Sequence, residues 1–207
     1  NELRLRIGAN PLAEEERASI LGQIRALDRH HGRRLRDTYR AFETSLRPVP
    51  AGLARERRQV HGILEKAGAV LIAGGHLPVL QNRLQLFGLK RLLRRRPILA
   101  WSAGAMALCR AAYLFYDDPP HGRGYPEVTA PGLGLVAGIV ALPDASRRLR
   151  LGDEERVAMF ARRVAPTRGA LLDDGAGLLW DGRRLRPALR GARVLGLDGQ
   201  VVDWREA

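Results

Sequence analysis

The 207-residue sequence has little cysteine, few aromatic residues and no long apolar run. Cys109 is the only cysteine, so no disulfide can form within the chain, as is usual in a reducing compartment. The longest apolar stretch, 97–109, is well below the roughly 20 residues that span a bilayer. No charged-then-apolar leader opens the chain either. These absences predict a soluble, cytoplasmic protein that does not contact membranes.

Lysine is also scarce, although the net charge is +13. All basic residues except Lys66 and Lys90 are arginines. The arginines alternate with acids in segments such as 14–17 and 55–58, and no aromatic residues accompany them as stacking platforms. This pattern favours solvated helix surfaces over a nucleic-acid interface, and the positive field favours acidic small ligands.

Length and a hydrophobic content of 45% predict one domain over residues 1–207 with a sizeable core. We expect an N-terminal helical segment over 1–50 and the core over 51–207. The helical segment is either one long helix or two helices broken near Gly32, and it either caps the site or joins two copies in a homodimer. The chain begins at Asn1, with a strand-like run over 3–7, and we expect further residues upstream.

The most informative motif is a short apolar run, 97–101, that leads into Ser102 among small residues. It predicts a strand, a sharp turn and a helix, because Ala103 and Gly104 leave room for a strained backbone that exposes the serine Oγ. The first amides of the helix would face an oxyanion formed above Ser102. The pattern indicates acyl transfer by a nucleophilic serine; the alternative is an ordinary helix start packed on a sheet.

A similar unit lies upstream, where the strand-like run 69–73 precedes Gly74, Gly75 and His76, and a helix is expected over 77–95. Consecutive units of this kind form parallel strands whose loops meet at one edge of the sheet. The glycine amides are therefore expected close to Ser102, as further oxyanion donors.

Downstream, the pattern predicts a strand over 138–142, a helix that opens at 153–155 and a strand over 169–173. Before them, the proline- and glycine-rich segment 117–134 is expected to be a loop that overhangs the site. Two tight turns, Asp181-Gly182 and Asp198-Gly199, predict antiparallel hairpins at the C-terminus.

Three motifs, at 71–75, 100–105 and 172–175, resemble those of the peptidase E and cyanophycinase family. The similarity covers about residues 67–179. It implies an α/β fold of the class I glutamine amidotransferase type, a three-layer sandwich with a mostly parallel sheet, here followed by the C-terminal hairpins. It also implies a serine peptidase that acts beside aspartyl residues, in dipeptides or in the cyanophycin polymer.

By this resemblance Ser102 takes the place of the nucleophile and Asp174 that of an acidic catalytic residue. Gly75 and Ala103 stand where the oxyanion amides are expected, with Gly74 beside them. The implied partner is a small acidic peptide, without metal or cofactor. A class I amidotransferase would carry cysteine at the elbow, so glutaminase activity is not expected.

The sequence departs from the family at the base, because 143–149 contains no histidine and Asp144 stands at the corresponding place. Loss of the histidine from a serine-protease triad lowers the rate by on the order of 10⁶. His76 and His121 are candidate substitutes, although each is also typical of an ordinary loop residue. The alternative is a catalytically impaired member that binds an acidic peptide or metabolite through Arg147 or nearby arginines. A base within hydrogen-bond reach of Ser102 Oγ would distinguish the two.

Overall fold

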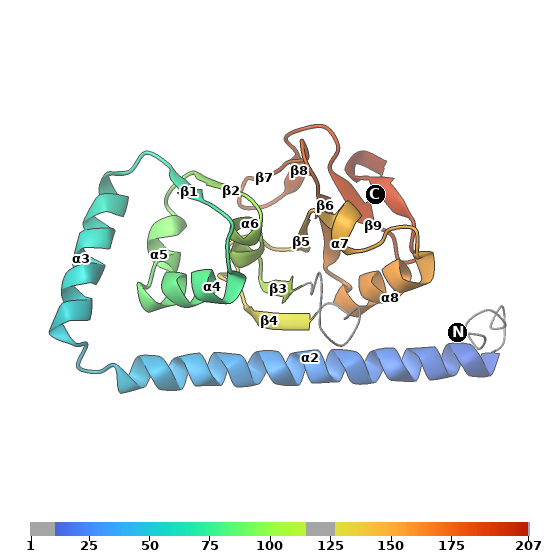
Figure 1. The fold of residues 1–207 in the computed structure, drawn as a ribbon, viewed down its shortest axis with the longest axis horizontal. Coiled ribbons are helices and arrows are strands. Elements are labelled where there is room, and N and C mark those ends of the chain that lie inside the picture. Colours follow the sequence, from blue (N-terminus) through green and yellow to red (C-terminus); the bar gives the residue numbers. More distant parts are fainter. Residues whose placement is uncertain (1–10, 115–126, 207) are drawn as a thin grey trace.

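The computed structural model describes residues 11–114 and 127–206, drawn in colour in Figure 1. The strand-like run 3–7 and His121 lie outside the described residues, as does the first part of the expected loop. The N-terminal segment is a single helix, α2 (Pro11–Ser45), followed by α3 (Ala51–Lys66). At 1.5 Å per residue α2 is about 50 Å long. Helix α2 runs along one side of the molecule (Figure 1).

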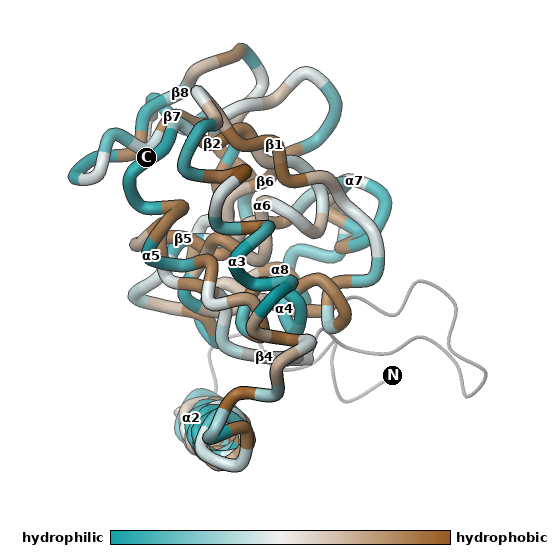
Figure 2. The backbone as a smooth tube through the Cα atoms, turned by 90° about the vertical axis from the view of Figure 1, so that its left-hand side faces the viewer, coloured by the Kyte–Doolittle hydropathy of each residue, from teal (hydrophilic) through white to brown (hydrophobic). Residues whose placement is uncertain are grey.

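Of the two predicted alternatives, the structure has the single long helix, without a break near Gly32. One glycine inside a helix costs about 1 kcal/mol, which the neighbouring turns of α2 and its contacts with the rest of the chain can offset. Arg163 pairs with Asp28 through two bonds of 2.6 Å. Arg17 lies 2.8 Å from Glu155. Figure 2 shows α2 end-on, below the remainder of the chain.

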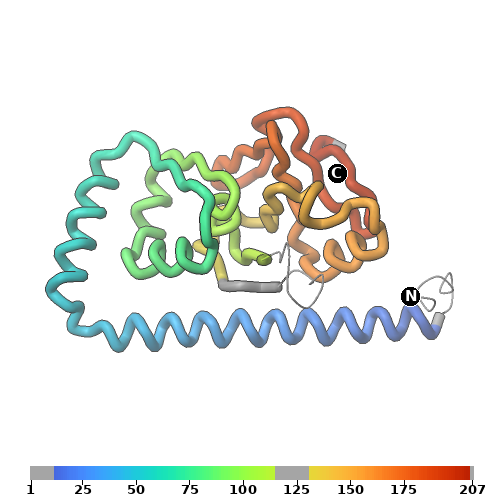
Figure 3. Tube along the Cα trace, viewed as in Figure 1, coloured from blue at the N-terminus to red at the C-terminus, as the bar shows by residue number. Residues whose placement is uncertain are grey.

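Helix α3 turns the chain away from the end of α2 toward the first strand (Figure 3). Two strand-turn-helix units follow, as predicted. Strand β1 (Val70–Ile72) precedes α4 (Leu77–Leu86) and α5 (Lys90–Leu93). Strand β2 (Ile98–Ala100) precedes α6 (Ala103–Leu108). The two strands are parallel, with Ile72 opposite Ala100, so the turns that follow them meet at one edge.

The single helix expected over 77–95 is wrong, because Gly88 divides it into α4 and α5. Gly88 has a φ of 64°, and the Leu89 N–H donates to the Leu84 carbonyl at 3.0 Å. A glycine with positive φ, followed by a residue whose N–H donates back to a carbonyl in the last turn of the helix, is the Schellman motif. This motif ends α4.

The rest of the described chain consists mostly of short strands, with two helices between β5 and β6. Its elements are β3 (Ala111–Leu114), β4 (Glu127–Pro131), β5 (Ile139–Pro143), α7 (Ala145–Arg148), α8 (Glu154–Val164), β6 (Arg168–Leu172), β7 (Leu178–Trp180), β8 (Leu185–Pro187), β9 (Arg193–Leu195), β10 (Val201–Asp203) and the 3₁₀ helix η1 (Trp204–Glu206). Strand β4 falls within the expected loop 117–134 and pairs antiparallel with β3, so that part of the loop prediction is wrong.

The strands form small, mixed sheets. One sheet has the order β10-β9-β6-β5, in which β5 and β6 are parallel and the other pairs are antiparallel. The pairs β1-β2, β3-β4 and β7-β8 are separate two-stranded sheets. The fold is therefore mixed α/β. Both predicted C-terminal hairpins are present, as β7-β8 and β9-β10.

The core lies on both sides of β5, all five residues of which are buried. One cluster joins β5 and β6 to α8 and contains Leu142, Leu171 and Val157. The other cluster packs α4, α5 and α6 against buried residues of β1, β3, β5, β6 and β9. Tyr113, in the first cluster, meets Phe160 edge-on at 5.4 Å. Among the described residues, no helix is both long and apolar enough to cross a membrane.

Candidate active site at Ser102

Ser102 has a backbone conformation that residues other than glycine rarely adopt, with φ 52° and ψ −130°. Such a conformation costs of order 1–3 kcal/mol and persists only where the surroundings impose it. Two contacts do so here. The Trp101 N–H donates to the Ile72 carbonyl at 3.2 Å, and the Gly104 N–H donates to the Trp101 carbonyl at 3.0 Å. The predicted strained elbow is therefore present, and Ser102 is exposed at its tip.

Two glycines make the elbow sterically possible. A Cβ on Gly74 would lie 2.7 Å from the Ser102 Cβ and 2.8 Å from its Oγ. A Cβ on Gly104 would overlap the carbonyl oxygen of Ile72. Only glycine thus fits at either position without a shift of the backbone or of Ser102. The structure brings Gly74 and Ser102 together, as the parallel arrangement of β1 and β2 predicted.

The amides expected to bind an oxyanion are available. Gly75, with φ 128°, follows Gly74, and Ala103 is the first residue of α6. Within the described part of the chain, neither the Gly75 N–H nor the Ala103 N–H donates to an acceptor. Backbone N–H groups without an acceptor, next to a serine in the chain or next to the glycine packed against it, are the kind of donors that stabilise a tetrahedral oxyanion.

The described residues place no base in hydrogen-bond contact with Ser102. Across residues 11–114 and 127–206, no side chain makes a hydrogen bond with the Ser102 Oγ. His76 is exposed and precedes α4, directly after Gly75. The described residues contain no group of three or more His, Cys, Asp or Glu side chains placed to hold a metal ion.

Asp144, at the place of the family's histidine, is held by arginines. It has a left-handed backbone, with φ 53°, and its N–H donates to the Leu172 carbonyl at 3.3 Å across the ends of β5 and β6. Its carboxylate lies 3.0 Å from Arg147 Nε and 3.9 Å from Arg148 Nε. The Asp144 carboxylate is therefore engaged by arginines and makes no hydrogen bond with Ser102 in the part of the chain that the structure describes.

Beside Asp144 lies a network that sequence reasoning missed. Asp173 accepts hydrogen bonds from the Ser146 N–H at 3.0 Å, from the Ser146 hydroxyl at 2.8 Å and from Arg193 at 2.6 Å. Burial alone would raise the pKa of Asp173, but these hydrogen bonds and the Arg193 charge hold that pKa below its usual value. The sequence signal for this network is the pair of acids that follows β6, of which the sequence analysis assigns a role to Asp174 alone.

Asp174 itself is exposed in the turn after β6, and it makes no hydrogen bond or ion pair with the described residues. Arg147 is also exposed, and its Nε–H points to Asp144. The structure therefore gathers Gly74, Gly75 and Ala103 around Ser102. It gathers Asp144, Arg147 and the Asp173 network separately, at the ends of β5 and β6, with no hydrogen bond or ion pair that links them to Ser102 among the described residues.

Comparison with known proteins adds no assignment. No protein-family model matches the chain, and a search of the curated proteins finds no match. The functional argument accordingly rests on the backbone of Ser102, the amides beside it and the residues at the end of β5.

Proposed function

We propose that Ser102 is the nucleophile of a serine-peptidase-like hydrolase that resembles peptidase E and cyanophycinase and cleaves peptide bonds beside aspartyl residues. The observation that carries the proposal is the φ of 52° at Ser102, with Gly74 tight against its side chain. Strain of this kind, at an exposed serine that is followed by an unused amide at the start of a helix, is typical of a nucleophile elbow. A plain helix start needs no such strain.

In the proposed reaction, Ser102 Oγ attacks the peptide carbonyl carbon while a base takes its proton. The oxyanion accepts hydrogen bonds from the Gly75 and Ala103 amides. The tetrahedral intermediate collapses, the amine leaves with the proton, and water then hydrolyses the acyl-serine. His76 is the candidate base, because it directly follows the Gly74-Gly75 turn that packs against Ser102 and imidazole is the usual general base of serine hydrolases.

A second function is favoured by one observation, the pairing of Asp144 with Arg147 at 3.0 Å. An ion-paired carboxylate in the place of the histidine indicates a site that binds without turnover. In that case the two free amides hold the carboxylate of an acidic peptide or metabolite, and Ser102 donates a hydrogen bond instead of attacking.

The proposal extends to the fold and the location. The parallel pairs β1-β2 and β5-β6, each followed by a helix or a short turn, support a relationship to the three-layer sandwich of class I glutamine amidotransferases. A cytoplasmic location fits the single buried thiol, Cys109.

The test is covalent labelling with a fluorophosphonate, with the modified peptide identified by mass spectrometry. The proteins compared are wild type, Ser102→Ala, His76→Ala and Asp144→His. Ser146→Ala is the matched control, because Ser146 is another exposed serine and is hydrogen bonded to a carboxylate. Hydrolysis of an aspartyl dipeptide is followed in parallel.

If the hydrolase proposal is right, wild type and Ser146→Ala are labelled at Ser102, and His76→Ala loses most of the labelling. Labelling of Asp144→His alone would instead support the binding function, because the elbow would then be intact and lack only its base. Absence of labelling in all variants would contradict a nucleophilic role for Ser102.

A further inference from the structure

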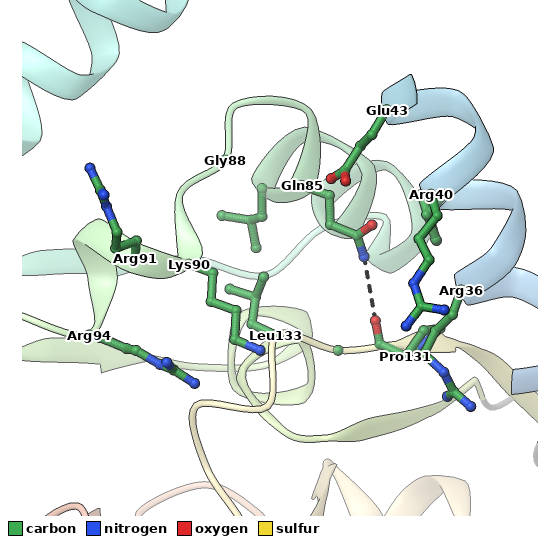
Figure 4. Close-up of a pocket in the computed structure, with 13 residues that line it drawn as sticks. Arg36, Arg40, Glu43, Gln85, Gly88, Lys90, Arg91, Arg94, Pro131 and Leu133 are labelled. Atoms are coloured by element: carbon green, nitrogen blue, oxygen red, sulfur yellow. Dashed lines mark hydrogen bonds between the residues drawn. The ribbon is translucent and has the colours of Figure 1, made fainter. Parts of the chain in front are cut away.

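A cavity lies away from Ser102, between α2, the end of α4 and the segment after β4 (Figure 4). Its volume is about 560 Å³. Leu84, Gln85 and Gly88 line it from the C-terminal end of α4, whereas His76 and the elbow lie at the N-terminal end of the same helix. Ten residues of helix separate the two ends by about 15 Å. The cavity is thus distinct from the proposed active site.

The lining of this cavity is strongly basic. Five cationic side chains and one acid line it, namely Arg36, Arg40, Lys90, Arg91, Arg94 and Glu43. Figure 4 shows Arg40 reaching from α2 toward Pro131, and Lys90 and Arg94 extending toward the same space from α5 and its end. Arg91 points away. Charges from segments about fifty residues apart in the chain therefore converge on one space.

Most of these cations have no acidic partner in the part of the chain that the structure describes. Arg40 lies 3.4 Å from Asp37, but Arg36, Lys90 and Arg94 form no ion pair with a described residue. Five cations against the single acid Glu43 leave a local excess of positive charge in the lining, which favours a bound anion. Several cations around one cavity favour an anion with several charges.

The other walls of the cavity indicate that the ligand also has an organic part. Tyr39, Leu84 and Leu133 supply apolar surface, and partial burial raises the pKa of Tyr39. Gln85 offers an amide and donates to the Pro131 carbonyl at 3.5 Å. Cavities of roughly 300–1,000 Å³ suit small organic ligands, and the volume here is within that range.

We propose that this cavity binds a small organic polyphosphate of the size of a nucleoside triphosphate. Lys90 and Arg94 would contact the phosphates from one side and Arg40 from the other, since guanidinium groups bind phosphate oxygens in pairs. Tyr39 and Leu133 would contact the organic part, and Glu43 would accept a hydrogen bond from a hydroxyl or amino group. A single-stranded nucleic acid is less well matched, because aromatic platforms for successive bases are lacking in this lining.

The test is isothermal titration calorimetry of the whole chain with ATP, inorganic tripolyphosphate, adenosine and a short single-stranded oligonucleotide. The variant is the double substitution Lys90→Gln, Arg94→Gln. Arg95→Gln is the matched control, because Arg95 is the exposed neighbour of Arg94 and does not line the cavity. Circular dichroism of each variant checks that the fold is retained.

We expect ATP to bind more tightly than tripolyphosphate or adenosine, with an affinity that falls as salt is added. The double variant should bind ATP about 10- to 100-fold more weakly, since each lost charged contact lowers affinity by up to about tenfold. Arg95→Gln should bind as wild type does. No ATP binding, equal affinity for tripolyphosphate, tighter binding of the oligonucleotide, or an effect of Arg95→Gln as large as that of the double variant would each overturn the proposal.

Discussion

The backbone of Ser102 allows a direct measurement of the strain at the elbow. At φ 52° and ψ −130° any side chain with a Cβ is unfavourable, whereas glycine adopts such values freely. Ser102→Gly should therefore relieve strain that Ser102→Ala retains. Both variants remove the same hydroxyl, which is exposed, so their difference isolates the backbone.

The expected difference in the free energy of unfolding between Ser102→Gly and Ser102→Ala follows from two opposing effects. Relief of the strained conformation contributes about 1–3 kcal/mol. Glycine also makes the unfolded chain more flexible, which costs about 0.5–1 kcal/mol. Because Ser102 precedes α6, no penalty for glycine inside a helix is added. We expect Ser102→Gly to be more stable than Ser102→Ala by about 1 kcal/mol, a rise in Tm of about 2–4 °C for a chain of this size.

The assay is thermal and chemical unfolding of the two variants under the same conditions. Calorimetry gives the difference in Tm, and denaturant titration gives the difference in the free energy of unfolding. If Ser102→Gly unfolds at the same temperature as Ser102→Ala or below it, the elbow is not strained. The main argument for a nucleophile at this position would then be lost.

Three further substitutions test the packing and charge arguments. Gly104→Ala should lower the free energy of unfolding by on the order of 3 kcal/mol, measured by denaturant titration, because its Cβ would overlap the Ile72 carbonyl. Asp28→Asn should cost about 1–3 kcal/mol and speed hydrogen exchange in α2, because Arg163 and Asp28 are each only 16% exposed. The pKa of Asp173 is lower in the folded chain than in the unfolded chain. The ionised Asp173 carboxylate therefore stabilises the fold fully above its unfolded-state pKa near 4, and this stabilisation is lost as the pH falls through the folded-state pKa. The Tm difference between wild type and Asp173→Asn should therefore shrink below about pH 4.

Local chemistry explains which elements could be predicted from the sequence. The hairpin turns depend on Asp181 and Asp198, whose side chains accept backbone N–H groups two residues later at 2.9 and 3.0 Å. The glycine after each aspartate supplies the positive φ. The start of α8 depends likewise on Asp153, which accepts the Arg156 N–H at 3.1 Å. Such signals lie within a few residues of the element that they specify.

Predictions that depended on distant contacts were less complete. The continuity of α2 through Gly32 is supported by ion pairs with α8, which no periodicity reveals. The antiparallel pairing of β4 with β3 was hidden because a segment rich in glycine and proline is also typical of a loop. At the site, the small residues around Ser102 were predictable, because the turn itself demands them. The Ser146-Asp173-Arg193 network was not, because its members lie on three separate segments.

The many arginines of the chain illustrate why net charge alone says little about function. Several have structural roles that suit a guanidinium: Arg57 donates to the Leu86 carbonyl at the end of α4 at 2.8 Å, and Arg96 donates to the Leu64 carbonyl at the end of α3 at 3.2 Å. Helix ends leave such carbonyls unpaired, and a guanidinium can donate to them from several directions. These charges are accounted for by the fold. The informative charges are those that the fold brings together in excess of the described acids, as around the cavity at Lys90, which five cations and one acid line. A ligand is inferred from that local excess, which a count over the whole sequence cannot distinguish from charges used in capping helices.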